Sequence, residues 1–128
     1  MELEFFRCKH CGQIIKKVKD TKVSVICCGE KMEKMIPNTT DAAKEKHVPV
    51  ISVNGLECTV AVSTVDHPMI EAHYIEWVII STNQGSYKYI LGPNMAPVAK
   101  FNLREGEIVE NAYDYCNLHG LCKRLQHF

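Results

Sequence analysis

Four of the seven cysteines fall in the first 28 residues, and this clustering constrains the fold more than any other feature of the chain. Cys8 and Cys11 form a Cys-x-x-Cys pair, and Cys27 and Cys28 are adjacent. A segment of about 36 residues buries too little apolar surface to fold without a metal, disulfides or a partner subunit. Residues 1–36 are therefore predicted to form a small module that a metal ion holds together.

Metal ligation is the favoured role of these four cysteines. The N-terminus starts acidic and lacks the basic and apolar segments of a secretory signal, so we expect a cytoplasmic protein. In that reducing compartment, clustered cysteines are more often metal ligands than disulfides. Four thiolates suit a tetrahedral zinc or a single iron. Two adjacent cysteines strain the bond angles at a metal that they both bind. A structural zinc gains nothing from this strain, whereas the properties of an electron-transfer iron can be tuned by it. The four cysteines alone therefore do not decide between zinc and iron.

Residues 37–128 are predicted to form a second, larger module that is rich in β-strands. Residues 37–46 are polar and begin with proline, which is typical of a linker. Asn54-Gly55 and Asn83-Gln84-Gly85 are typical of hairpin turns between consecutive strands. Short runs of β-branched and aromatic residues follow one another with such turn signals at residues 48–53, 56–63, 74–81, 86–91 and 98–103. This spacing predicts a β-sandwich.

Charge and hydropathy exclude two classes of function. Fifteen basic and fifteen acidic residues give zero net charge, so the chain offers no general basic field for nucleic acid. No run approaches the roughly 20 apolar residues that a membrane span needs. We therefore expect neither a nucleic-acid-binding protein nor a membrane protein.

Histidines supply a second set of candidate ligands in the larger module. His47, His67 and His73 lie at expected strand edges or in loops, and Cys116 and His119 form a Cys-x-x-His pair. One histidine alone is usually a surface residue, but four with a cysteine on one side of a sandwich indicate a metal site. Blue copper sites carry a methionine after the last histidine, and none follows His119. Four imidazoles and a thiolate suit iron and leave one octahedral position open for a small molecule.

The order and spacing of these motifs resemble the desulfoferrodoxin family of two-iron superoxide reductases. The Cys-x-x-Cys pair followed by "CCGE" is similar to the four-thiolate iron site of desulforedoxin. "EKHVPV", "HPMIEAHYIEW" and "DYCNLHG" are similar to the three pieces of the neelaredoxin-like catalytic site. The likeness covers nearly the whole chain. It implies a mainly β protein, with a small rubredoxin- or desulforedoxin-like domain at residues 1–36 and a seven-stranded immunoglobulin-like β-sandwich at residues 37–128.

The resemblance also implies a role for each candidate residue. One iron per chain is held by four thiolates, and the second by four equatorial histidines and one axial cysteine. The ligands of the first iron are Cys8, Cys11, Cys27 and Cys28, and those of the second are His47, His67, His73, His119 and Cys116. Glu45 falls where the family has a carboxylate that binds the sixth position in the oxidised state, and Lys46 where it has a lysine near the open position. Without the resemblance, both residues are expected in a solvated charged loop.

The implied activity is the one-electron reduction of superoxide to hydrogen peroxide, without formation of oxygen. A cation such as Lys46 beside the pocket attracts superoxide and stabilises the developing negative charge. The oxidised site must be reduced again, so a rubredoxin-like electron donor is implied, and the family is typically homodimeric. The alternative is an iron-binding electron-transfer protein whose histidine site is not catalytic. The complete set of five ligands, together with Glu45 and Lys46, favours the enzyme.

One position departs from the family pattern. A tryptophan is expected after "HGL", and the chain has Cys122 there. We expect this residue to be an inert, small apolar side chain rather than an oxidisable thiol. Cys58 lies in an apolar strand pattern and is predicted to be in the core. His10 and His127 are predicted not to bind metal.

Overall fold

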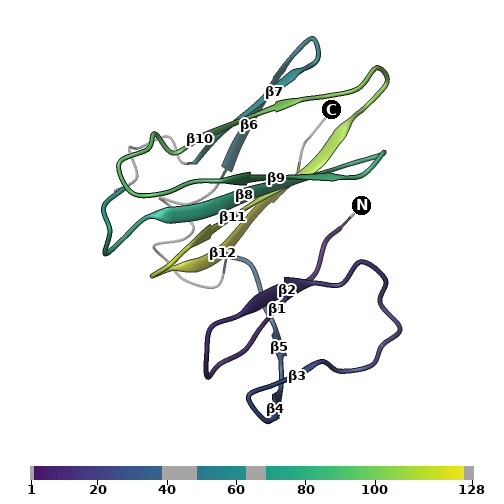
Figure 1. Ribbon diagram of the computed structural model, residues 1–128. Helices are drawn as coiled ribbons and strands as arrows, with labels where there is room; N and C mark the ends of the chain where they lie inside the picture. Colours follow the sequence, from purple (N-terminus) through teal and green to yellow (C-terminus); the bar gives the residue numbers. More distant parts are fainter. Residues whose placement is uncertain (1, 39–48, 63–68, 126–128) are drawn as a thin grey trace. The chain divides into compact units, whose positions relative to one another are not determined.

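The computed structural model describes residues 2–38, 49–62 and 69–125 (Figure 1). The chain divides into two compact units, Glu2–Ile36 and Pro37–Phe128. Both are built from antiparallel strands, which the β-branched and aromatic runs favour. The described residues contain no helix that is long and apolar enough to cross a membrane.

Five very short strands form the smaller unit. A three-stranded sheet has β1 (Phe5–Arg7) between β2 (Ile14–Lys16) and β5 (Glu33–Lys34). A separate hairpin pairs β3 (Ile26–Cys27) with β4 (Glu30–Lys31). Strands of two or three residues contribute few ladder hydrogen bonds, so this unit depends on contacts outside its sheets.

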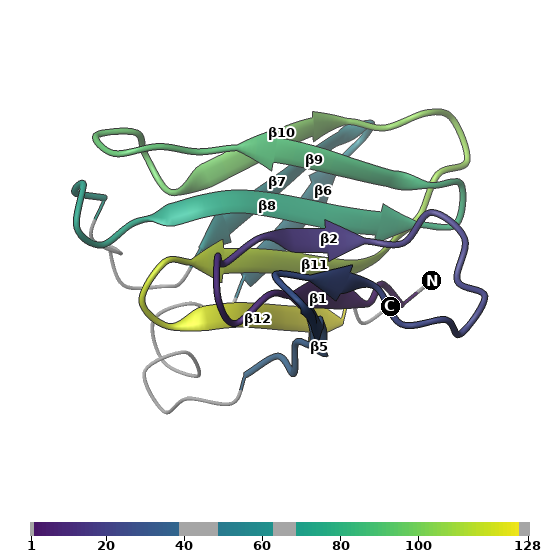
Figure 2. The same ribbon diagram turned by 60° about the horizontal axis from the view of Figure 1, so that its bottom comes forward.

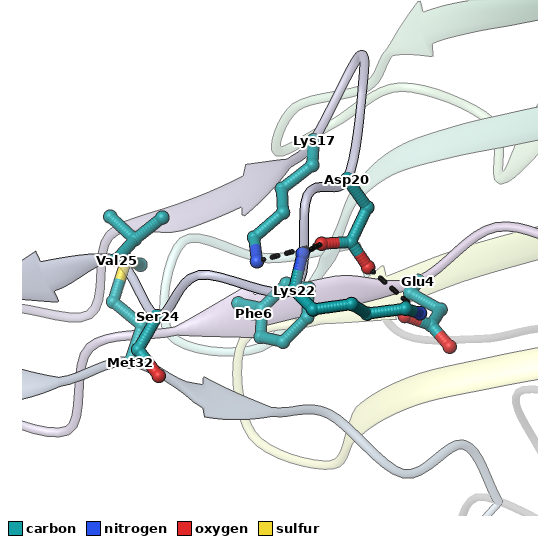
Figure 3. Close-up of a pocket in the computed structure, with 8 residues that line it drawn as sticks. All are labelled: Glu4, Phe6, Lys17, Asp20, Lys22, Ser24, Val25 and Met32. Carbon is teal, nitrogen blue, oxygen red and sulfur yellow. Dashed lines mark hydrogen bonds and ion pairs between the residues drawn. The ribbon is translucent and has the colours of Figure 1, made fainter.

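Lys17 supplies several of those contacts by tying the segment that follows β2 to β1 (Figure 3). Its ammonium group lies 4.8 Å from the centre of the Phe6 ring, donates to the carbonyl of Val23 at 2.9 Å and pairs with Asp20 at 3.2 Å. The backbone N–H of Lys22 donates to the same carboxylate at 2.8 Å. This bond and the Lys17 ammonium lower the pKa of Asp20 to about 2. Polar contacts therefore hold a segment that has little apolar core.

The described residues of the larger unit form a seven-stranded β-sandwich, and its two sheets lie as layers in Figures 1 and 2. The three-stranded sheet has the order β10-β7-β6, with β6 (Pro49–Asn54), β7 (Glu57–Val62) and β10 (Val98–Asn102). The four-stranded sheet has the order β12-β11-β8-β9, with β8 (Ile75–Thr82), β9 (Ser86–Ile90), β11 (Val109–Cys116) and β12 (Gly120–Leu125). All neighbouring strands are antiparallel. The predicted mainly β, seven-stranded sandwich is confirmed.

Alternate residues of the strands form one core between the two sheets. Val60 and Val62 of β7 belong to the same buried cluster as Val78 and Ile80 of β8. Cys58 is fully buried in this cluster, as predicted, and burial raises its pKa to about 11. Cys116, at the end of β11, also belongs to it. The core thus reaches directly to one candidate metal ligand.

The five strands predicted from the sequence correspond to β6 through β10, with ends that differ by at most one residue. Both predicted hairpin turns are present, since β6 pairs with β7 and β8 with β9. The first turn is displaced by one residue from the predicted pair. Gly55, with a φ of 63°, occupies the first of the two positions between Asn54 and Glu57, where a type II′ turn places glycine.

Strands β11 and β12 had no counterpart among the predicted apolar runs. Asn111 and Asp114 interrupt the pattern of β11, although both side chains are buried. The first residues of the predicted linker are structured, because the side-chain amide of Asn38 makes two hydrogen bonds with the backbone of β12. Its Nδ2 donates to the Lys123 carbonyl at 3.1 Å, and its Oδ1 accepts from the Lys123 N–H at 3.1 Å. The remainder of the linker, 39–46, lies outside the described residues.

Candidate metal centres

The thiolate cluster, which we define as Cys8, Cys11, Cys27 and Cys28, is built by two tight turns of the smaller unit. After β1 the chain folds back, and the Gly12 N–H donates to the Cys8 carbonyl at 2.9 Å. Between β3 and β4, Cys28 and Gly29 are the two central residues of a turn and have φ values of 51° and 78°. Two consecutive positive φ values are characteristic of a type I′ hairpin turn.

The geometry of the thiolate cluster fits a single tetrahedral ion. All four Sγ atoms lie within 4.8 Å of one another, and those of Cys11 and Cys27 are 3.6 Å apart. A tetrahedral ion with metal–sulfur bonds of about 2.3 Å separates its sulfurs by about 3.8 Å. The adjacent pair therefore reaches one site together with Cys8 and Cys11. Cys28 pays for this with a left-handed backbone, which costs a non-glycine residue about 1–2 kcal/mol.

Backbone donors favour a thiolate at one corner of the cluster. Hydrogen bonds from the N–H groups of Cys11 and His10 lower the pKa of Cys8 to about 6, although burial opposes them. The pKa of Cys27 is raised to about 12, chiefly by its hydrogen bond with Cys8 and then by that with Cys11. Sulfurs this close together disfavour several negative charges at once unless a cation lies among them. Four ligating thiolates at neutral pH require a cation among them.

His10, which was predicted not to bind metal, is engaged elsewhere. Its Nε2 lies 2.9 Å from Glu30, and the Lys9 ammonium lies 2.8 Å from the same carboxylate. The hydrogen bond from Lys9 lowers the pKa of Glu30 most, and the one from His10 lowers it further. Within the described residues, the group able to hold an ion comprises the four cysteines and leaves His10 out.

A second set of candidate ligands meets at one end of the sandwich, where β8 begins and β11 ends. His73 precedes β8, Cys116 is the last residue of β11, and His119 lies in the turn that leads to β12. The rings of His73 and His119 have centres 4.9 Å apart and planes at 67°. The strand register places Cys116 opposite Ile75 on β8 and Gly120 on β12. Two segments that are more than 40 positions apart in sequence, one with His73 and one with Cys116 and His119, therefore meet at this end of the sandwich.

Cys116 is fully buried at the edge of the core. Burial raises its pKa, whereas the backbone N–H groups of Leu118 and His119 lower it; the charges of Asp114 and Glu76 raise it further. The two N–H donors are oriented to stabilise negative charge on the sulfur. A cation at the sulfur would offset the burial penalty, which is what a metal ligand needs.

Four predicted site residues, Glu45, Lys46, His47 and His67, lie outside the described residues. His73, Cys116 and His119 are the members of the catalytic set that the structure describes. The rings of His73 and His119 are in contact, and Cys116 lies at the neighbouring end of β11. Cys122, predicted to be inert, is fully buried on β12, and burial raises its pKa. That environment disfavours the reactive thiolate form.

Two residues near this site were missed by the sequence analysis. Asp114 is fully buried, both carboxylate oxygens lack a hydrogen-bond partner among the described residues, and burial raises its pKa well above the usual value. The sequence could have indicated Asp114, because it lies two residues before Cys116 and alternate residues of a strand share a face. Asn117 joins the loop of His73 to the loop of Cys116, and no local pattern in the sequence indicates this contact.

Comparison with known proteins finds relatives of both units of the chain. Residues 1–35 match the family model of the desulfoferrodoxin N-terminal domain, and residues 39–124 match that of desulfoferrodoxin. The chain is 43% identical over 119 residues to a desulfoferrodoxin of Nitratidesulfovibrio vulgaris, which covers 93% of each chain.

Solved structures show the same relationship. The superoxide reductase of Treponema pallidum superposes with a TM-score of 0.80 at 36% identity, covering 96% of this chain and 97% of that one. The one-iron superoxide reductase of Giardia intestinalis gives a TM-score of 0.54 at 30% identity, over 66% of this chain and 99% of that one. The two matching family models and the level of identity show that this chain belongs to the desulfoferrodoxin family.

Proposed function

We propose that this protein is a superoxide reductase, which reduces superoxide to hydrogen peroxide at an iron held by four histidines and one cysteine. The observation that carries the proposal is the convergence of His73, Cys116 and His119 at one end of a sandwich of this family. The ligand set is completed by His47 and His67 in the proposal. A second iron is proposed for the thiolate cluster, whose geometry fits a tetrahedral ion.

Bound iron supplies one electron to superoxide and a position at which superoxide reacts. The chain supplies the surroundings of that position. Cys116 presents its sulfur from the buried end of β11, so water has little access to it on the core side. The N–H groups of Leu118 and His119 stabilise negative charge on this sulfur and fix its direction. Hydrogen bonds of this kind hold a ligand in place and adjust how strongly it donates electrons.

The charged residues before His47 are proposed to serve the substrate. Lys46 attracts the superoxide anion and stabilises the negative charge that develops as it is reduced. Glu45 is proposed as a carboxylate that would act as a further ligand of the iron. One superoxide, one electron and two protons give one hydrogen peroxide, so water-borne protons complete the reaction.

Each turnover leaves the catalytic site one electron short. We therefore propose an electron-donor protein of the rubredoxin type as a partner, which places the protein in an electron-transport chain. The thiolate cluster is an additional one-electron site when it holds iron. Lys9, which follows Cys8, pairs with Glu30 of β4 at 2.8 Å.

A homodimer in the cytoplasm is the proposed form of the protein. The smaller unit exposes Val18, Val23, Ile26 and Ile36, whose side chains are between 59% and 99% exposed. A second copy that covered part of this apolar surface would compensate for the unit's small core. The seven cysteines form no disulfide, as is usual in a reducing compartment.

Replacing Lys46 by alanine tests the proposed role of this residue in the reaction. The rate constant for superoxide with the reduced protein should fall several-fold, up to about ten-fold, because one attractive charge is lost. The rate should also depend less on ionic strength, since salt screens a smaller attraction. Pulse radiolysis measures both effects. Lys100→Ala removes an exposed charge from β10 and serves as control; equal rates in both variants and the wild type would assign Lys46 to a solvated loop.

A further inference from the structure

Asn117 lies between two proposed ligands, Cys116 and His119, and makes three hydrogen bonds to the segment that carries a third. Its backbone N–H donates to the Tyr74 carbonyl at 3.3 Å, and its Oδ1 accepts from the Tyr74 N–H at 3.0 Å. Its Nδ2 donates to the Ala72 carbonyl at 3.0 Å. The bonded groups belong to the residues immediately before and after His73.

These bonds fix His73 relative to Cys116 and His119. The His73 backbone is also held by Ile70, since each donates its N–H to the carbonyl of the other, at 3.0 and 3.1 Å. The His73 segment therefore has its conformation set by Ile70 and its register set by Asn117. The 4.9 Å separation of the His73 and His119 rings follows from that register.

The same arrangement occurs at the opposite end of β8, where none of the proposed ligands lies. The Asn83 N–H donates to the Ile108 carbonyl at 3.0 Å, and its Oδ1 accepts from the Ile108 N–H at 2.8 Å. Its Nδ2 donates to the Gly106 carbonyl at 3.3 Å. Asn83 and Asn117 thus bind residues i and i−2 of a facing segment in the same way. The sandwich therefore has the same set of asparagine hydrogen bonds at both ends of β8. The contribution of these bonds to stability can be measured at Asn83, away from the metal site.

One feature distinguishes Asn117 from Asn83. The Oδ1 of Asn117 lies 3.8 Å from the Sγ of Cys116, so the side-chain amide borders the proposed axial ligand. The amide is oriented by its bonds to Ala72 and Tyr74 and cannot turn away without breaking them. A change at Asn117 therefore affects the surroundings of the sulfur and the position of His73 together.

We propose that Asn117 is a positioning residue of the catalytic metal centre, which holds His73 in register with Cys116 and His119. This inference rests on the iron site of the proposed function. Residues that hydrogen-bond around metal ligands commonly contribute about 10–100-fold to metal affinity. The effect of Asn117 is expected to act on iron retention and on the spectrum of the site before it acts on the fold.

The test compares Asn117→Ala with Asn83→Ala in the iron-loaded full-length protein. Each substitution removes the equivalent Oδ1 and Nδ2 hydrogen bonds of one asparagine, so both should lower the melting temperature by similar amounts. Asn117→Ala should release the catalytic iron to a chelator about ten-fold faster and shift the absorption band of the cysteine–iron bond. It should also speed hydrogen exchange at the Tyr74 amide. Asn83→Ala should leave iron release and the band unchanged.

Asn117→Asp provides a second variant if the alanine variant does not fold. An aspartate keeps an acceptor for the Tyr74 N–H, loses the donor to Ala72 and brings negative charge near the Cys116 sulfur. We expect intermediate iron release and a lower reduction potential of the site. Iron release from Asn117→Ala no faster than from Asn83→Ala, with an unchanged band, would overturn the proposal. These readouts need no superoxide, so a wild type that binds iron but does not react would refute the proposed function alone.

Discussion

Cys116→Ser is expected to remove the cysteine-to-iron absorption band and to slow superoxide reduction by about a hundred-fold or more. Serine is close to cysteine in size, so the end of β11 keeps its packing while the soft, electron-donating sulfur is lost. Changes in residues that only support a metal ligand already cost about 10–100-fold. Loss of the proposed axial ligand itself should lie at the upper end of this range or beyond it. Optical spectroscopy and pulse radiolysis on iron-loaded protein measure the two effects.

Cys122→Ser is the matched control for this experiment. Cys122 is also fully buried on the four-stranded sheet, one strand away from Cys116. Serine is more polar than cysteine, so burying its hydroxyl at this position should make the variant less stable. Its band and its reaction with superoxide should nevertheless persist. A band that survives in Cys116→Ser, or that disappears in Cys122→Ser, would contradict the assignment of the axial ligand.

Cys11→Ser is expected to unfold the smaller unit, residues 2–36, while the sandwich stays folded. Among the described apolar side chains of this unit, Phe5, Cys8 and Met32 are buried, which is too small a core for independent folding. Metal binding contributes about 10–16 kcal/mol to folding in modules held by similar sites. Cys11 is exposed, so its replacement removes a ligand without leaving a packing defect.

Two-dimensional NMR after a chelator challenge distinguishes the two units residue by residue. In Cys11→Ser the amide signals of residues 2–36 should collapse into the narrow range of an unfolded chain. His10→Ala lies in the same turn but outside the cysteine cluster, and it should retain both metal and signal dispersion. A Cys11→Ser protein that keeps a folded smaller unit without metal would show that the cluster is not its main source of stability.

The sandwich was predictable to the extent that its strands are apolar. β6 through β10 carry β-branched and aromatic runs, and glycine-containing turns join β6 to β7 and β8 to β9. Local rules identify such runs and turns. β11 escaped these rules although it lies in the middle of its sheet, because buried Asn111 and Asp114 break its apolar pattern. Asn111 is accommodated by a hydrogen bond from its Nδ2 to the Ser81 Oγ at 3.0 Å, 30 positions away in sequence. Such a partner is visible only after the strands have paired.

The metal centres, like the strands, were predictable only where the relevant residues lie close together in sequence. The spacing of the four N-terminal cysteines indicates one site directly, because all the ligands come from two short segments. Strain from adjacent cysteines at one metal stays a prediction; the structure shows that Cys28 has a positive φ. The role of Asn117 could not be predicted, since its bonds to Tyr74 and Ala72 span 43 and 45 positions. Those segments meet only through the pairing of β8 with β11.

The stoichiometry of superoxide consumption distinguishes a superoxide reductase from a superoxide dismutase. Protein with two irons per chain is reduced, exposed to a substoichiometric pulse of superoxide, and assayed for hydrogen peroxide and oxygen. A superoxide reductase is predicted to form one hydrogen peroxide for each superoxide consumed, with no oxygen, while one catalytic iron is oxidised for each superoxide. Half as much peroxide together with an equal amount of oxygen would mean dismutation. That result, or zinc in both sites of protein grown with iron, would contradict the account.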